Sequence, residues 1–195
     1  RSRNAKLRLI GDYLKVTPDP DRGWALAALT GEVDLPAVKP AAIRAMIEER
    51  VDPLLFRLSR DYVGDTAETV ALMWPEPVGD QPAEPPLSLA ATVARLMVLK
   101  RGEGPAVLAA MLDRLDSAGR FALLKLATGG MRIGVSGRLA RTAVAEAFGL
   151  DVDAIEQIWH GLAPPYAELF DWAEGRADAP DLSGRPLFRP FMLAH

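Results

Sequence analysis

Apolar residues recur every three or four positions along most of this chain. The spacing is clear at Leu7, Ile10 and Leu14, and again at Ile43 and Ile47. Residues with this spacing line one face of an α-helix. Alternating runs of β-branched residues, which would indicate strands, are nearly absent. The pattern therefore predicts an all-α fold, an irregular multi-helix bundle of about ten or more helices.

Residues that favour helix starts precede many of these periodic runs. Asp52 stands before Pro53, and Asp65 is followed three residues later by Glu68, the spacing of a capping box. Further start signals are Ser88, Ser117, Ser136 and Asp151. The apolar positions of the runs give a candidate core that includes Leu26, Leu54, Leu58, Leu72, Leu96 and Ile155.

A proline-rich stretch, residues 75–86, interrupts the helical pattern. It holds five prolines together with Gly79 and Asp80, so it predicts a long surface loop. This loop would divide the chain into helical halves of about residues 1–76 and 87–178. The closing residues, 186–195, have the pattern of an extended apolar segment, and position 1 is not methionine. We therefore expect the chain to be a fragment of a longer protein.

Composition limits the chemistry available to the chain. Its 195 residues, 49% of them hydrophobic, suffice for a substantial core. The absence of cysteine excludes disulfides, thiolate zinc sites and a cysteine nucleophile. Only His160 and His195 carry imidazoles, and His160 stands near the end of a helical pattern, where a structural role is expected. No apolar run approaches the roughly 20 residues of a membrane span, so we expect a cytoplasmic protein with no membrane or metal partner.

The segment from Thr128 to Arg141 combines four glycines with three arginines and opens an amphipathic helix at Ser136. Glycines let backbone N–H groups come close to a partner, and a helix N-terminus without acids nearby attracts anions. The segment thus predicts a phosphate-facing loop. The alternative interpretation is that the glycines only end one helix and begin the next.

Charge is unevenly distributed along the chain, although its formal net charge is only -3. Residues 117–145 contain five basic residues and no acid, whereas residues 146–181 carry nine carboxylates against one arginine. Two further basic clusters are Arg1, Arg3, Lys6 and Arg8 near the N-terminus and Arg95, Lys100 and Arg101 before a glycine turn. This asymmetry predicts a basic face on an acidic protein, with ordinary solvated helix faces as the alternative.

Five stretches, taken in order, resemble one family. They are residues 2–7, 62–71, 102–105, 123–136 and 188–194. In this order they look like the N-terminal DNA-binding domain of ATP-dependent DNA ligases, and the resemblance spans essentially the whole chain. Its most specific part is the glycine segment, with Met131 where the family usually has leucine. Two residues do not suit a purely electrostatic contact with phosphate: Glu103 and Asp65 place acids in the two shorter turns.

The resemblance implies an all-helical domain that lies on the minor groove of nicked duplex DNA and holds it without reading its sequence. Arg132 would reach into the minor groove. The main contact segment would comprise Thr128, Gly129, Gly130, Arg132, Gly134 and Ser136. The turns at Gly102 and Gly104 and at Gly64 would approach the backbone elsewhere. Basic neighbours expected to support binding are Lys125, Arg138, Lys100, Arg101, Arg3 and Lys6.

The resemblance also implies a larger enzyme that seals nicks in DNA repair, replication or recombination. Ligases of this family take AMP from ATP on a lysine in a Lys-x-Asp-Gly pattern, and no lysine here is followed by that pattern. Residues 1–195 would then form a single, monomeric DNA-binding domain with no catalytic residue and no cofactor of its own. ATP and Mg²⁺ would bind downstream nucleotidyltransferase and OB-fold domains, and residues 179–195 would be the linker to that catalytic core.

Two other classes of function remain open from the residues themselves. A helical protein–protein interaction scaffold would show a large exposed apolar groove and no anion partner for the glycine segment. An autonomous enzyme would show a deep pocket with strongly shifted carboxylate pKa values.

Overall fold

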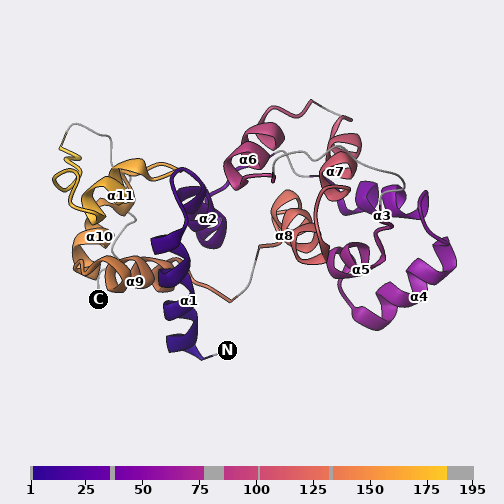
Figure 1. Ribbon diagram of the computed structural model, residues 1–195, viewed down its shortest axis with the longest axis horizontal. Coiled ribbons are helices and arrows are strands. Elements are labelled where there is room, and N and C mark those ends of the chain that lie inside the picture. Colours follow the sequence, from indigo (N-terminus) through magenta and orange to yellow (C-terminus); the bar gives the residue numbers. More distant parts are fainter. Residues whose placement is uncertain (1, 36–37, 77–85, 101, 132–133, 184–195) are drawn as a thin grey trace, which may run out of the picture. The chain divides into compact units, whose positions relative to one another are not determined.

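The computed structural model describes residues 2–35, 38–76, 86–100, 102–131 and 134–183. Within these ranges the chain forms eleven α-helices and no strand (Figure 1). The predicted all-α class, a multi-helix fold, is thereby confirmed. None of the helices in these ranges combines the length and apolar character needed to cross a membrane.

The helices form two compact units. The first contains α1 (Arg3–Val16), α2 (Asp21–Thr30), α9 (Gly137–Phe148), α10 (Val152–Trp159) and α11 (Ala167–Ala173). The second contains α3 (Pro40–Glu48), α4 (Pro53–Val63), α5 (Thr66–Met73), α6 (Leu89–Met97), α7 (Gly104–Leu112) and α8 (Ser117–Ala127).

The boundaries between the units differ from the expected division into helical halves at residues 75–86. The chain leaves the first unit after Val33 and returns to it after Met131. Residues 77–85 of the proline-rich stretch lie outside the described residues. Units are defined by which helix faces pack together, and faces that match can be far apart in sequence. A local signal such as a proline cluster does not report that pairing.

The packing of α1 against α9 forms the centre of the first unit. Leu7 and Leu14 of α1 are buried in the same cluster as Ala143 of α9. Gly11 allows the two helices to approach closely, since a Cβ at this position would lie 3.3 Å from the Ala147 Cβ. Small residues at a helix crossing thus join the N-terminal helix to a helix from the second half of the sequence.

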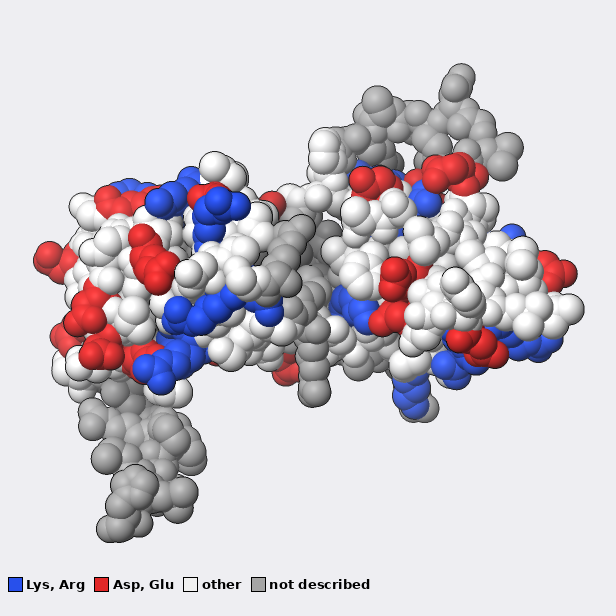
Figure 2. Space-filling view, turned by 90° about the horizontal axis from the view of Figure 1, so that it is seen from below, with Lys and Arg blue, Asp and Glu red and all other residues white. Residues whose placement is uncertain are grey.

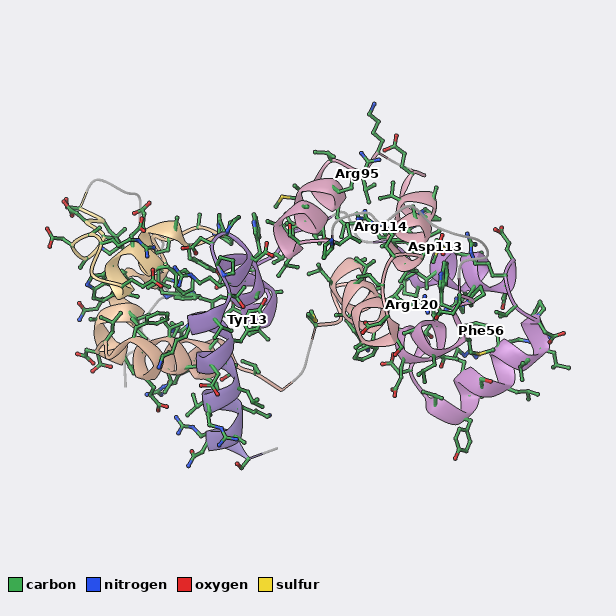
Figure 3. All side chains as sticks on the ribbon, viewed as in Figure 1. Tyr13, Phe56, Arg95, Asp113, Arg114 and Arg120 are labelled. Carbon is green, nitrogen blue, oxygen red and sulfur yellow. The ribbon has the colours of Figure 1, made fainter. Side chains whose placement is uncertain are left out.

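In the second unit, Arg120 near the start of α8 is a buried polar anchor (Figure 3). Its side chain is 3% exposed and donates hydrogen bonds to the Leu112 carbonyl oxygen at 2.9 Å and to Glu76 Oε1 at 3.0 Å. Close by, Trp74 Nε1 donates to Asp113 Oδ1 at 2.8 Å. These bonds connect the ends of α5 and α7 with α8. Arg120 therefore serves the core and adds no charge to a basic surface.

Most predicted helix starts are confirmed. The side chains that accept a hydrogen bond from an amide in the first turn of their helices include Asp52, Asp65, Ser88, Ser136 and Asp151. The prediction for Ser117 is wrong by one residue, because the Asp116 carboxylate caps α8 by accepting from the Gly119 amide at 2.7 Å. Local cap chemistry is therefore a good guide to where the helices begin.

The predicted core is confirmed only in part. Leu26 and Ile155 are fully buried, whereas Leu54, Leu58 and Leu72 are 57, 61 and 65% exposed. Helical periodicity identifies an apolar face, but it does not tell whether the same chain covers that face. The three exposed leucines all lie on α4 and α5.

Candidate nucleic-acid interface

Lys6 joins the first helix to the glycine segment. Its Nζ donates to the Gly134 carbonyl oxygen at 2.8 Å, and the two residues are 128 positions apart. Gly134 has a φ of 69°, which favours glycine, and a Cβ there would lie 3.0 Å from Lys6 Nζ. Because a carbonyl acceptor carries no formal charge, this hydrogen bond does not neutralise the lysine as an ion pair would. Arg3, one turn earlier on α1, is exposed.

Helix α9 begins at Gly137, three residues after Gly134. Ser136 caps the helix, its hydroxyl oxygen accepting from the Leu139 amide at 3.1 Å. The first turn contains no acid, and the Arg138 side chain is 81% exposed. The first amides of a helix have no partner within the helix, and the helix dipole adds positive potential there. This end of α9 can therefore accept an anion beside Lys6 and Gly134.

The C-terminal end of α8 uses its glycines differently. The Gly129 amide donates to the Leu126 carbonyl at 3.2 Å, and the Gly130 amide donates to the Lys125 carbonyl at 2.8 Å. With Gly129 at a φ of 68°, this pair of bonds is a Schellman motif, which satisfies the last carbonyls of a helix. The Thr128 hydroxyl also donates to a carbonyl of α8. The capping interpretation is confirmed for these two glycines, and their amides already have acceptors.

Lys125, in the last turn of α8, forms an ion pair with Asp65 at the start of α5. The Asp65 carboxylate also accepts from the Glu68 amide at 3.0 Å. Partial burial acts to raise the pKa of Asp65, but the hydrogen bonds from Lys125 and Glu68 and the lysine charge outweigh it. The pKa is held below its ordinary value of 3.8. Gly64, which ends α4 at a φ of 80°, thus adjoins a neutralised pair.

The turn before α7 is closed by its own acid. Glu103 Oε2 accepts from the Lys100 amide at 3.0 Å, and Gly102 has a φ of 93°. Lys100 and Gly102 are exposed. Gly104 is buried, and a Cβ there would lie 3.1 Å from Val38 Cγ2. This glycine therefore permits close packing inside the second unit.

The predicted contact residues divide between the two units. Those in the first unit are Arg3, Lys6, Gly134, Ser136 and Arg138. Those in the second are Gly64, Lys100, Gly102, Gly104, Lys125, Thr128, Gly129 and Gly130. Arg101 and Arg132 lie outside the described residues, and Arg132 is the arginine expected to enter the minor groove.

The fold places acids beside basic residues that have no acidic neighbour in the sequence. Glu156 Oε1 of α10 lies 3.6 Å from Arg141 Nε and 3.9 Å from Arg138 Nε. Lys125 and Arg120 also have carboxylate partners. On the face shown in Figure 2, acidic and basic side chains of the described residues are interspersed. Sequence reasoning missed these pairings, because each acid is distant along the chain and no local signal indicates it.

The described residues contain no group of three or more histidine, aspartate and glutamate side chains arranged to hold a metal ion. His160 is the C-cap residue of α10, at the helix end predicted for it, and His195 lies outside the described residues.

A search of protein-family models and a search of curated proteins each found no match to this chain.

Proposed function

We propose that the first unit binds the sugar–phosphate backbone of duplex DNA at the start of α9. The contact that carries this proposal joins Lys6 to Gly134 at 2.8 Å. In this contact the lysine ammonium is bonded to an uncharged acceptor at a glycine turn. The turn leads into the N-terminus of α9, which is capped by Ser136 and has no acid in its first turn. Two exposed arginines are close in sequence to the contact: Arg3 precedes Lys6 by three residues, and Arg138 follows Gly134 by four. Lysines, arginines and helix N-termini are the groups that bind phosphates without reading bases.

We further infer that the chain acts as the N-terminal DNA-binding domain of an ATP-dependent DNA ligase, with nicked duplex as its target. Two of the five stretches that carry the resemblance, residues 2–7 and 123–136, contain Lys6 and Gly134, which the fold brings into contact. In this proposal Arg132 enters the minor groove. Nick sealing, ATP and Mg²⁺ belong to nucleotidyltransferase and OB-fold domains, and this chain contributes binding without catalysis.

The proposed binding is electrostatic and should therefore be modest and sensitive to salt. The chain has a formal net charge of -3, and several of its basic side chains have carboxylate partners. Each phosphate contact adds about -0.9 to the slope of log affinity against log salt. A few contacts from Lys6, Arg3 and Arg138 would give a shallow but measurable slope.

Fluorescence anisotropy with a nicked duplex, an intact duplex of the same sequence and a single strand, at several salt concentrations, tests this function. We expect duplex to bind better than single strand, with log affinity falling linearly against log salt. Lys6→Gln should weaken binding and make the slope of log affinity against log salt shallower by about 1. Lys15→Gln is a matched control, since Lys15 is exposed at the other end of α1. Equal losses in both variants, or no binding of any DNA at low salt, would contradict the proposal.

One observation favours a second function, the protein-interaction scaffold. Helix α4 carries large apolar side chains that are more than half exposed. Surfaces of this kind mark contacts with other proteins. The residues concerned are separate from Lys6, Gly134 and the start of α9, so the two functions are compatible.

A further inference from the structure

Helix α4 presents an apolar surface to solvent. Leu54, Leu55, Leu58 and Tyr62 are 57, 56, 61 and 93% exposed, and Leu72 of α5 is 65% exposed. We call these five residues the α4 face. Figure 2 shows a broad area without charged side chains over the end of the second unit that holds α4, with charged residues at its edge. Single exposed apolar residues are ordinary, whereas five large ones on neighbouring helices mark an interaction site.

The α4 face borders a groove between α4 and α5. The groove has a volume of about 440 Å³, and its lining includes Leu58, Tyr62, Leu72 and Met73. Phe56 is the buried residue that anchors α4, and the helix packs along α5. The remaining apolar side of α4 is not covered by the described residues of its own unit, although its sequence has the periodicity of a core helix.

The spacing of the α4 face suits another helix. Leu54, Leu58 and Tyr62 are four residues apart, so they form a ridge along α4. Ridges of this spacing pack into the grooves of a second helix in the commonest class of helix pairs. An exposed tyrosine at one end of the ridge is also a residue type that contributes strongly to interfaces. The expected occupant is therefore a helix with apolar residues at the same intervals.

The charges beside the ridge identify which helix fits. Arg57 and Asp61 are both exposed and are four residues apart on one side of the ridge. If two copies of α4 run antiparallel and cross near Leu58, Arg57 of each copy lies opposite Asp61 of the other. In the same arrangement Leu54 lies opposite Tyr62. The face is thus complementary to itself in both shape and charge, as an interface with two-fold symmetry requires.

We infer that the α4 face is a self-association surface, on which α4 of a second copy of this chain packs antiparallel across a two-fold axis near Leu58. Such an interface uses the same patch on both copies, so association stops at the dimer. This inference is independent of DNA binding, because none of its residues belongs to the proposed DNA contact. It differs from the monomer expected from the ligase resemblance.

The dimer should be weak. A face built from one helix and one neighbouring residue falls short of the roughly 800 Å² per partner of a standard interface. Arg60 Nη2 already donates to Asp61 Oδ1 at 2.7 Å, so the pair between copies lies at an exposed rim and adds specificity more than affinity. Association should become measurable at protein concentrations on the order of 100 µM.

Sedimentation velocity from about 10 µM to about 500 µM tests the inference. The wild-type chain should show a sedimentation coefficient that rises with concentration toward that of a dimer. Leu58→Glu places two carboxylates at the symmetry axis and should lower the association constant at least about tenfold. Leu9→Glu is the matched control, because Leu9 is 42% exposed on α1 in the other unit. It should associate like the wild type, and circular dichroism should show native helix content in both variants.

A charge exchange tests the antiparallel arrangement itself. Arg57→Asp and Asp61→Arg should each weaken association by placing like charges opposite one another, and the double variant should restore it. Two outcomes would overturn the inference. One is a wild-type chain that stays monomeric over the whole range, which would assign the α4 face to a different protein. The other is a Leu58→Glu variant that associates as strongly as the wild type.

Discussion

Two lysines beside glycine turns have opposite kinds of acceptor in this molecule. In the first unit, Lys6 Nζ donates to the carbonyl oxygen of Gly134. In the second, Lys125 Nζ donates to the carboxylate of Asp65. A carbonyl leaves the ammonium charge uncompensated, whereas a carboxylate cancels it. Net charge at a glycine turn therefore depends on the acceptor that the fold supplies, and this difference favours the first unit as the proposed phosphate site.

The glycines of the two turns differ in the same way. Gly134 and Gly129 have nearly identical φ values of 69° and 68°. A Cβ on Gly134 would lie 3.0 Å from Lys6 Nζ, whereas a Cβ on Gly129 would meet nothing within 4 Å. Gly129 is therefore needed for the helix cap alone. Gly134 is favoured by its backbone conformation, and a Cβ there would in addition press on the Lys6 ammonium.

Reversal of the lysine charge should have the largest effect. Lys6→Glu removes the donor to Gly134 and places a carboxylate where a phosphate would bind, so duplex affinity at low salt should fall by about tenfold or more. Lys125→Glu, which faces Asp65 with a like charge, should mainly lower thermal stability and should reduce affinity less than Lys6→Glu, because it adds repulsion without removing a proposed phosphate contact. Anisotropy and thermal denaturation measure both effects. Equal losses of affinity would remove the proposed difference between the units.

Alanine at the two glycines should separate strain from function. Gly134→Ala and Gly129→Ala each force an L side chain into the left-handed region, at a cost of about 1 kcal/mol in unfolding free energy. Only Gly134→Ala should also weaken duplex binding, by at most about threefold, because its Cβ crowds Lys6 Nζ, which must shift by a few tenths of an ångström. Urea unfolding gives the first quantity and anisotropy the second. A Gly134→Ala variant with wild-type affinity would show that the lysine position does not matter.

Asp65→Asn should make the acceptor of Lys125 uncharged, like the acceptor of Lys6. Asparagine still caps a helix, so α5 keeps its start, but the Lys125 charge is no longer cancelled. We expect duplex affinity to rise about twofold at low salt and the gain to disappear at high salt. The titration compares wild type and variant on the same nicked duplex. A gain that persists at high salt would point to a change of structure instead of charge.

Asp65 should also contribute to the acid sensitivity of the fold. Its pKa in the folded chain lies below the ordinary 3.8, so the charged form is stabilised by folding. That contribution is fully present above the unfolded pKa and is lost as the pH falls through the folded pKa. Thermal midpoints measured from about pH 6 to about pH 3 should fall less for Asp65→Asn than for the wild type. Parallel curves would exclude Asp65 as a source of the decline.

The parts of the fold that depend on local chemistry could be predicted from the sequence. Helix class follows from apolar spacing, and Ser136 and Asp52 cap helices because a side-chain oxygen three residues from an amide is a local arrangement. Coverage of an apolar face is not local. Leu54 and Leu58 have the spacing of core residues, yet they are exposed, because no other helix of the described chain packs over them.

The candidate site was predictable as a set of residues but not as a set of contacts. Lys6 and Gly134 could both be named from the sequence, whereas their hydrogen bond depends on the packing of α1 against α9. The neutralisation of Lys125 could not be predicted, because Asp65 lies 60 positions away. Residue types indicate what a site can do, and long-range packing decides which of its charges remain available.

Arg138 should show the smallest effect, because its environment is intermediate between those of the two lysines. Its side chain is 81% exposed, and its Nε lies 3.9 Å from Glu156 Oε1, at the limit of an ion pair. Solvent screens such a pair, so much of the arginine charge remains available to a phosphate. Arg138→Ala should weaken duplex binding about twofold, equally for duplexes of different sequence, since a phosphate contact carries no base information. Glu156→Gln should strengthen binding by a similar factor if the carboxylate partly cancels Arg138. A sequence-dependent loss in Arg138→Ala would contradict a backbone contact and indicate that this arginine reads base edges.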